Sequence, residues 1–285
     1  MGLIPISRRR DKKLEKQQRD LRAVIGDQEL AAFPALVSDA LRKISEPEFD
    51  LNQIADLLVR DPGVTMRLLG MVNSAALSRG RPITSVHQAV VILGRNQLES
   101  LLISLAVKGS LPSPTVAGFD GRRFWITAAR RAAIAGQLAS KTDPSRRSEN
   151  FTAALLQDMA LPVLAQRADG YSTTLQDWHE STSDLASLER SCHGWDHGEV
   201  GSLMATSWQF PSELVHFLDD HHSSPEPIDT LLPAKLVAPI RESDSSGDEQ
   251  LIETASAVYP IPTDQLVDLI KAADEEANQL ARLLV

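Results

Sequence analysis

The stretch Phe33-Pro34-Ala35-Leu36-Val37-Ser38-Asp39-Ala40-Leu41-Arg42-Lys43-Ile44-Ser45 indicates the fold class of this 285-residue chain. Its apolar residues recur at steps of three and four, which places them on one face of a helix. The resulting stripe consists of Leu36, Val37, Ala40, Leu41 and Ile44. This spacing predicts an amphipathic helix that packs in a helical bundle.

Helix start signals continue along the N-terminal half. Asp50 with Gln53 three residues later predicts a capping box at the start of a second helix, and Asp61-Pro62 ends that helix. Ser85 with Gln88 repeats the pattern before a further apolar run. Short, well-capped helices joined by tight turns predict a compact bundle of about five helices.

Gly94 marks the end of a helix in the first half, and the proline-containing stretch 111–118 is a natural boundary between two helical halves. The second half carries the same periodicity. Residues 122–140 and 263–284 each place an apolar stripe on one face, and the second stripe fits either the body of the protein or a dimer contact. We therefore expect an all-α fold with four parts: a basic N-terminal arm (1–22), an N-terminal bundle (23–117), a second helical part (118–224) and a C-terminal helical extension (225–285).

Composition fits a helical protein of the cytoplasm. The chain is 42% hydrophobic and only 5% aromatic, which favours packing by Leu, Ala and Val. No apolar run approaches the roughly 20 residues needed to cross a bilayer. The single cysteine, Cys192, permits no internal disulfide and fits a reducing compartment. We expect no membrane span and a cytoplasmic location.

Charge is concentrated at the N-terminus. Residues 1–22 hold eight Lys/Arg and three Asp/Glu, a balance of +5, which leaves 21 and 35, or −14, for the rest. A basic arm is able to contact nucleic acid, so a nucleic-acid-associated regulator is one hypothesis, and a solvated tail is the alternative. The acidic body argues against DNA binding by the globular part. The arm residues of this hypothesis are Arg8, Arg9, Arg10, Lys12, Lys13 and Lys16.

Several short motifs occur in a specific order between Ala32 and His222. The motifs are Arg60-Asp61-Pro62, Asn73-Ser74-Ala75, Pro82-Ile83-Thr84-Ser85, Leu93-Gly94 and Leu155-Leu156-Gln157-Asp158-Met159-Ala160. With these motifs in this order, the chain resembles the HDOD family, a branch related to the HD phosphohydrolases whose members have generally lost the metal-dependent activity. The resemblance implies an N-terminal bundle packed on a degenerate HD-like helical domain.

The resemblance also implies a damaged metal site. The first histidine of the HD pattern would fall at or near Thr127 and the second at Gln157, whereas Asp158 remains. Neither replacement has the basic imidazole nitrogen that holds a transition metal. We therefore expect these to be vestigial positions in a chain with no metal, no cofactor and no catalytic activity.

The remaining polar residues are weak ligand candidates. Asp158 is expected to bond a neighbouring helix end, and His197 follows Asp196, a plausible N-cap. Adjacent helical residues point about 100° apart, so at most one of His221 and His222 is expected to face a common pocket. A residual metal-dependent phosphohydrolase using Asp158, His197 and one of these two histidines stays as an alternative.

By resemblance the chain is a bacterial signalling protein that binds protein partners in trans, with inputs from cyclic-nucleotide or two-component pathways. Turns on a rigid scaffold commonly carry recognition, although these turns equally fit a purely connecting role. A homo-oligomer stays open. The expected interaction surface consists of Arg60, Asp61, Asn73, Ser74, Arg79 and Arg81.

Overall fold

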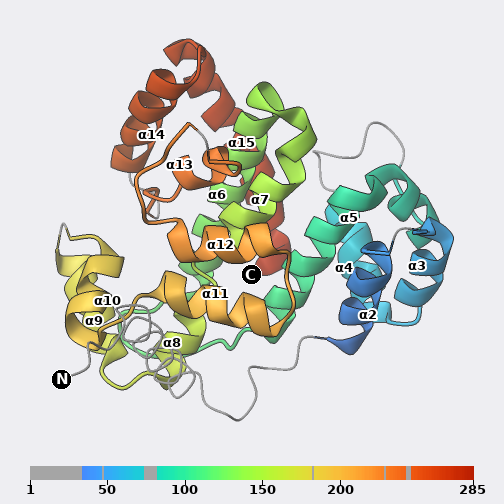
Figure 1. Ribbon diagram of the computed structural model, residues 1–285, viewed down its shortest axis with the longest axis horizontal. Helices are drawn as coiled ribbons and strands as arrows, with labels where there is room; N and C mark the ends of the chain where they lie inside the picture. Colours follow the sequence, from blue (N-terminus) through green and yellow to red (C-terminus); the bar gives the residue numbers. More distant parts are fainter. Residues whose placement is uncertain (1–33, 47, 74–81, 182, 228, 242–244) are drawn as a thin grey trace, which may run out of the picture.

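The computed structural model of the chain describes residues 34–46, 48–73, 82–181, 183–227, 229–241 and 245–285. All regular elements in these ranges are helices, and none of the described residues forms a strand. The fold is all-α, as the periodicity predicts (Figure 1). The basic arm, and with it the six arm residues of the nucleic-acid hypothesis, lies outside the described residues.

Among the described residues, four helices form the N-terminal bundle. These are α2 (Ala35–Ile44), α3 (Leu51–Leu58), α4 (Pro62–Val72) and the first part of α5 (Val86–Ser110). Helices α2, α3 and α4 each pack against α5. The stripe predicted for α2 faces this core, with Val37, Ala40 and Ile44 buried.

Side-chain caps start α3, α4 and α5, and the cap of α4 is the Asp61 carboxylate, which accepts from Gly63 N at 2.8 Å. The Asp50 carboxylate accepts a bond of 2.9 Å from Asn52 N, not from the Gln53 N that a capping box uses. The Ser85 hydroxyl accepts from Gln88 N at 3.3 Å. The N-cap positions were thus predicted correctly, whereas the cap at Asp50 uses a different backbone N–H.

Gly94 divides α5 into two segments. Its φ of +67° and ψ of −175° are non-helical, in a region that glycine adopts without a steric penalty. The prediction that a helix ends at Gly94 is confirmed, and the second segment starts directly after it. Helix α5 therefore turns without a loop, and its second segment leaves the bundle to pack against the rest of the protein (Figure 1).

The second segment of α5 forms a core between the two halves. Leu98, Leu102 and Val107 are buried, and α5 packs on α7 (Arg147–Leu156) as well as on the N-terminal bundle. By length and composition, α5 is the one described helix that is able to span a membrane. In the structure 56% of its most apolar window is buried within the protein.

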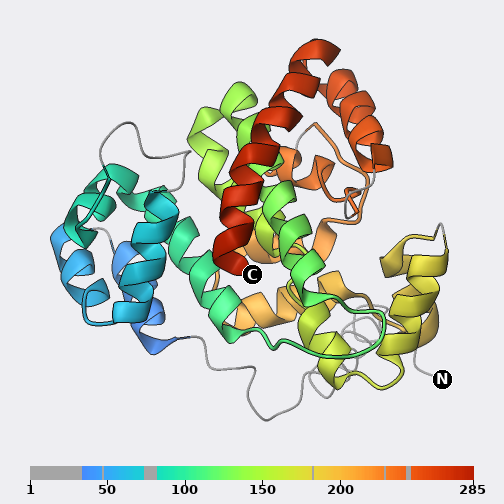
Figure 2. The same ribbon diagram turned by 180° about the vertical axis from the view of Figure 1, so that it is seen from behind.

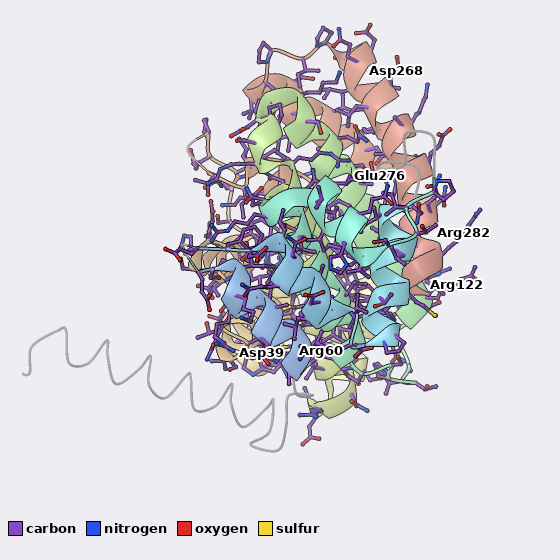
Figure 3. All side chains as sticks on the ribbon, turned by 90° about the vertical axis from the view of Figure 1, so that its right-hand side faces the viewer. Asp39, Arg60, Arg122, Asp268, Glu276 and Arg282 are labelled. Carbon is purple, nitrogen blue, oxygen red and sulfur yellow. The ribbon has the colours of Figure 1, made fainter. Side chains whose placement is uncertain are left out.

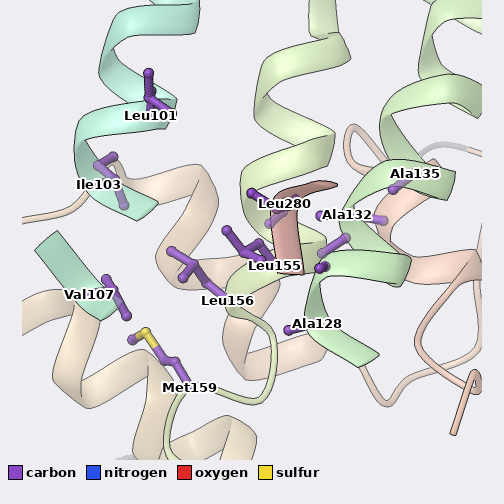
Figure 4. Close-up of a cluster of buried hydrophobic side chains, with 14 of the residues drawn as sticks. Leu101, Ile103, Val107, Ala128, Ala132, Ala135, Leu155, Leu156, Met159 and Leu280 are labelled. Carbon is purple, nitrogen blue, oxygen red and sulfur yellow. The ribbon is translucent and has the colours of Figure 1, made fainter. Parts of the chain in front are cut away.

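Helix α6 (Gly121–Thr142) is the centre of the second half, and it packs closely on α7. The residues predicted to point inward, among them Ala128, Ala132 and Ala135, are buried (Figure 4). Around this pair the chain adds η1 (Pro144–Arg146), α8 (Leu161–Arg167), α9 (Tyr171–Glu180), α10 (Leu185–His193), α11 (His197–Ser207) and α12 (Ser212–Asp220).

The C-terminal helices α13 (Leu232–Leu236), α14 (Ser245–Val258) and α15 (Thr263–Leu284) complete the body. Helix α15 lies along α6 (Figure 2), and its predicted stripe, which includes Leu266, Ala273 and Leu280, is buried. Glu276 pairs with Arg147 of α7 at 3.1 Å, from a position near the middle of α15 (Figure 3). The sequence left open whether this stripe packs on the body of the protein or forms a dimer contact, and in the structure it packs on the body.

Candidate functional site

Three imidazoles from two helices meet in the second half of the protein. His197 is the first residue of α11, and His221 and His222 directly follow α12. Ring nitrogens of the three lie within 4.8 Å of one another, and His222 Nε2 is 2.7 Å from His197 Nε2. His197 and His221 are buried, and His222 is half-buried. The cluster is the one group of metal-ligating side chains found among the described residues.

The expectation that at most one of His221 and His222 faces a common pocket was wrong. It treated both as helical residues about 100° apart. Helix α12 ends at Asp220, and His221 is its C-cap. The chain turns after that point, so both imidazoles reach His197.

Buried contacts position the His197 ring. The Glu189 carboxylate accepts a bond of 2.9 Å from His197 N and lies 2.7 Å from His197 Nδ1. Tyr171 OH donates to the other oxygen of Glu189. Because Glu189 holds Nδ1, His197 Nε2 points toward the other two histidines and Asp158. Sequence reasoning missed Glu189 and Tyr171, since neither lies in a local motif.

The start of α11 is also fixed. Asp196 accepts from Glu199 N at 2.9 Å and Glu199 accepts from Asp196 N at 3.3 Å, which forms a complete capping box. The N-cap predicted at Asp196 is confirmed. Gly198 permits close packing of α12, because an added Cβ would stand 2.8 Å from Leu218 O.

Asp158 faces this cluster from the end of α7. One oxygen pairs with Arg131 of α6, and the other lies 3.3 Å from His197 Nε2 and 3.6 Å from His221 Nε2. Asp158 was expected to bond a helix end, and its partner is instead the Arg131 side chain. Arg131 is 6% exposed and also donates from Nε to Ile240 O at 2.7 Å. A guanidinium inside the protein thus neutralises the remaining carboxylate.

The electrostatics of the cluster follow from these contacts. Burial disfavours the charged form of Asp158, but Arg131 and His197 outweigh it and hold the Asp158 pKa well below its ordinary value. Burial likewise opposes protonation of His197, but Glu189 and Asp158 raise its pKa well above the ordinary value. Burial, and after it the charge of His197, lowers the pKa of His222. These shifts favour the charged form of His197, the neutral form of His222 and the ionised form of Asp158.

The two vestigial positions lie beside Asp158. Thr127 and Gln157 line a cavity together with Asp158 and Arg131, and Gln157 is only 2% exposed. Since neither side chain has an imidazole, the residues present do not fit a two-metal centre. The three clustered histidines do fit one ion with nitrogen ligands, and His221 Nε2 is buried without a hydrogen-bond partner.

The expected interaction surface is only partly described, because Ser74, Arg79 and Arg81 lie outside the described residues. Arg60 is exposed at the end of the N-terminal bundle (Figure 3). The Asp61 carboxylate accepts from Gly63 N at 2.8 Å and from Val64 N at 3.1 Å, at the start of α4. The Asn73 side chain bonds both Ile83 N and Ile83 O at 2.7 Å. Asp61 and Asn73 thus have structural bonds, and Arg60 is the exposed side chain of the three.

Comparison with known proteins agrees with this architecture. Residues 30–224 match the HDOD domain. An uncharacterised protein of Treponema pallidum (strain Nichols) is 24% identical over 220 residues, which cover 76% of this chain and 42% of that protein. The chain therefore spans less than half of the length of this relative.

Solved structures share the fold at low identity. An HDOD domain protein of unknown function from Geobacter sulfurreducens has a TM-score of 0.72 at 20% identity, with 95% of this chain and 99% of that chain covered. A protein from Shewanella amazonensis SB2B, proposed to be a phosphohydrolase, has a TM-score of 0.73 at 22% identity, covering 93% and 98%. A protein from Marinobacter aquaeolei VT8, proposed to act in signal transduction, has a TM-score of 0.70 at 19% identity, covering 94% and 66%.

Proposed function

The chain belongs to the HDOD family, and from this premise we propose that it is a non-catalytic regulatory protein that binds a signalling protein in trans. The observation that carries the proposal is the ion pair between Arg131 and Asp158 at the vestigial metal site. In a working site of this kind, a metal cation would face that carboxylate. In this protein the guanidinium of Arg131 faces the carboxylate instead.

The neighbouring side chains support the same proposal. Metal-dependent phosphoryl hydrolysis needs several ligands that converge on the ion, which polarises the phosphoryl oxygen and activates water. Thr127 and Gln157 offer no imidazole beside Asp158. Glu189 and Asp158 raise the pKa of His197 well above its ordinary value, and a metal ion binds the unprotonated imidazole, so the cost of removing this proton opposes metal binding at this ring.

The setting of this regulator is part of the proposal. We place it in the bacterial cytoplasm, with input from a cyclic-nucleotide or two-component pathway. Arg60 and the turns around it, on the outer end of the N-terminal bundle, are the proposed contact for the partner. This face is built on capped helices, which gives the partner a rigid surface.

Complementation of a deletion strain of the source organism tests the proposal. The transcript profile of that strain is compared after it receives the wild-type gene, His222→Gln or Arg60→Glu. His222→Gln removes an imidazole from the cluster, and a non-catalytic regulator does not need that imidazole to act on the transcript profile. Arg60→Glu reverses a charge on the proposed contact surface. We expect His222→Gln to restore the wild-type profile and Arg60→Glu to fail. A His222→Gln protein that melts like the wild type but fails to restore the profile would contradict the proposal.

A residual phosphohydrolase with one ion is the second candidate, because His197, His221 and His222 converge within 4.8 Å. These three imidazoles would hold the ion, which would supply Lewis-acid polarisation of a phosphoryl oxygen. Glu189 would keep the His197 ring oriented. Calorimetric titration with zinc above neutral pH tests this candidate. Stoichiometric binding that His222→Gln abolishes supports it, and equal zinc uptake by both proteins overturns it.

A further inference from the structure

A wide groove lies where the N-terminal bundle meets the second half of the protein. Its volume is about 850 Å³, and its lining comes from α2, from α5 and from the turn between α11 and α12 (Figure 1). This volume lies in the range of roughly 300 to 1,000 Å³ that is typical of ligand sites, so several side chains of a docked segment fit in it. The apolar lining residues are Leu41, Ile103, Trp208, Phe210 and Pro211.

One side of α2 borders this groove. The lining residues of α2 recur at steps of three and four, which places them on one side of the helix. They are Ser38, Leu41, Arg42 and Ser45. Arg42 pairs with Asp39 of the same helix at 2.8 Å, so its charge is balanced locally. This side of α2 is distinct from the one that is buried in the bundle core.

Glu99 of α5 brings a half-buried carboxylate to the groove. None of the described residues gives this carboxylate a hydrogen bond or an ion pair. Burial raises the pKa of Glu99, the charge of Arg95 opposes this shift and the charge of Glu149 adds to it. Arg95 itself stacks over the Phe49 ring at 5.7 Å. A desolvated carboxylate without a partner favours an occupant that brings a positive charge.

The part of the chain that precedes α2 carries such charges. Residues 12–25, named here the arm segment, hold five Lys/Arg and two Asp/Glu, a balance of +3. Leu14, Leu21 and Ile25 recur at steps of seven and four residues, which is the spacing of an apolar face on a helix. The arm segment is therefore basic and amphipathic, and the groove offers both an unpaired carboxylate and apolar side chains.

The length of the connection allows this segment to reach the groove. Residues 26–33 separate the arm segment from Pro34, the N-cap of α2. Eight extended residues span up to about 27 Å. Helix α2 has 10 residues and is therefore about 15 Å long, so the connection exceeds its length. A tether of this length gives an effective concentration on the order of millimolar, at which even a weak contact forms within one chain.

We propose that the arm segment, residues 12–25, docks in this groove of its own chain. Its apolar side chains cover Leu41 and Ile103, and one of its Lys or Arg side chains pairs with Glu99. The contact joins the N-terminus of the chain to the junction of the two halves.

Limited trypsin digestion of the full chain, followed by mass spectrometry, tests this proposal. Trypsin cleaves after Lys and Arg, so cleavage after residues 8–10, outside the arm segment, gives a reference rate in the same molecule. The measured quantity is the rate of cleavage after Lys16 divided by this reference rate. Glu99→Gln leaves the sequence of the arm unchanged and removes the charge of the groove. We expect it to raise the ratio by about fivefold, because the protease cuts the undocked population.

Matched variants separate the proposed contacts from general effects. Leu21→Ser removes an apolar side chain of the arm segment and is expected to raise the ratio by about tenfold or more. Leu3→Ser, outside the arm segment, is its control. Glu253→Gln, at an exposed position of α14, is the control for Glu99→Gln. Both controls are expected to keep the wild-type ratio. A melting curve confirms folding, and Leu21→Ser carries the test if Glu99→Gln does not fold.

Two results would overturn the proposal. The first is a wild-type ratio in a folded Glu99→Gln variant or in Leu21→Ser. The second is a ratio that rises when the wild-type protein is diluted tenfold, because the groove would then hold the arm segment of a second copy of the chain. Neither result bears on the contact proposed at Arg60, so a failure here leaves the proposed regulatory function in place.

Discussion

Replacing Asp158 with alanine leaves the Arg131 guanidinium inside the protein without its carboxylate. Arg131 is 6% exposed, and the bond from its Nε to Ile240 O is a partner that it would retain. Removing one member of a buried ion pair costs roughly 3 to 5 kcal/mol, since the other charge stays desolvated. The Asp158 side chain is 17% exposed, so water reaches the site and favours the lower end of that range. We expect the free energy of unfolding at neutral pH to fall by about 3 kcal/mol.

Urea unfolding followed by circular dichroism measures this change. Asp39→Ala is the matched control, because Asp39 pairs with Arg42 at 2.8 Å on the surface of α2. Loss of this exposed ion pair is expected to change the free energy of unfolding by too little to measure. The double variant Asp158→Ala with Arg131→Met removes both charges and is expected to be more stable than Asp158→Ala alone. An Asp158→Ala protein within about 0.5 kcal/mol of the wild type would refute the role of this pair.

Two further predictions concern the histidine cluster. The raised pKa of His197 contributes stability that is complete below its unfolded value of about 6.5 and is lost as pH rises through the folded value. Glu189→Gln should reduce the fall in the free energy of unfolding as pH rises, which urea unfolding over a series of pH values measures. The same pH dependence in Glu189→Gln and in the wild type would contradict this role of Glu189. Gly198→Ala should destabilise the protein by roughly 1 to 3 kcal/mol, because its Cβ meets Leu218 O. Gly201→Ala, with no atom in its way, should be neutral or stabilising in thermal melts, and equal melting points for the two variants would contradict the close packing of α11 on α12.

Local signals in the sequence predicted most of the helical architecture. The stripe of α2, the caps at Asp50 and Ser85 and the break at Gly94 depend on residues a few positions apart, so their spacing is enough to place them. The packing of α15 was not decided in the same way. An apolar stripe has the same sequence pattern whether it packs on its own chain or on a second copy of the chain. Only the tertiary structure shows that α15 packs on α6.

The candidate site was less predictable because its contacts are tertiary. Glu189 and Tyr171 meet from different helices, and Arg131 pairs with Asp158 across 27 positions of sequence. The error at His222 came from a helix that ends one residue before the pair of histidines. Periodicity describes the inside of a helix well, and it gives little information on where side chains point beyond the helix end.

The most direct test of the central claim is elemental analysis of the purified full chain for transition metals, with a phosphodiesterase assay on the same sample. A non-catalytic regulator with Arg131 paired to Asp158 predicts metal far below one equivalent and no turnover, also after manganese or zinc is added. Stoichiometric metal with turnover that His222→Gln abolishes would contradict the claim.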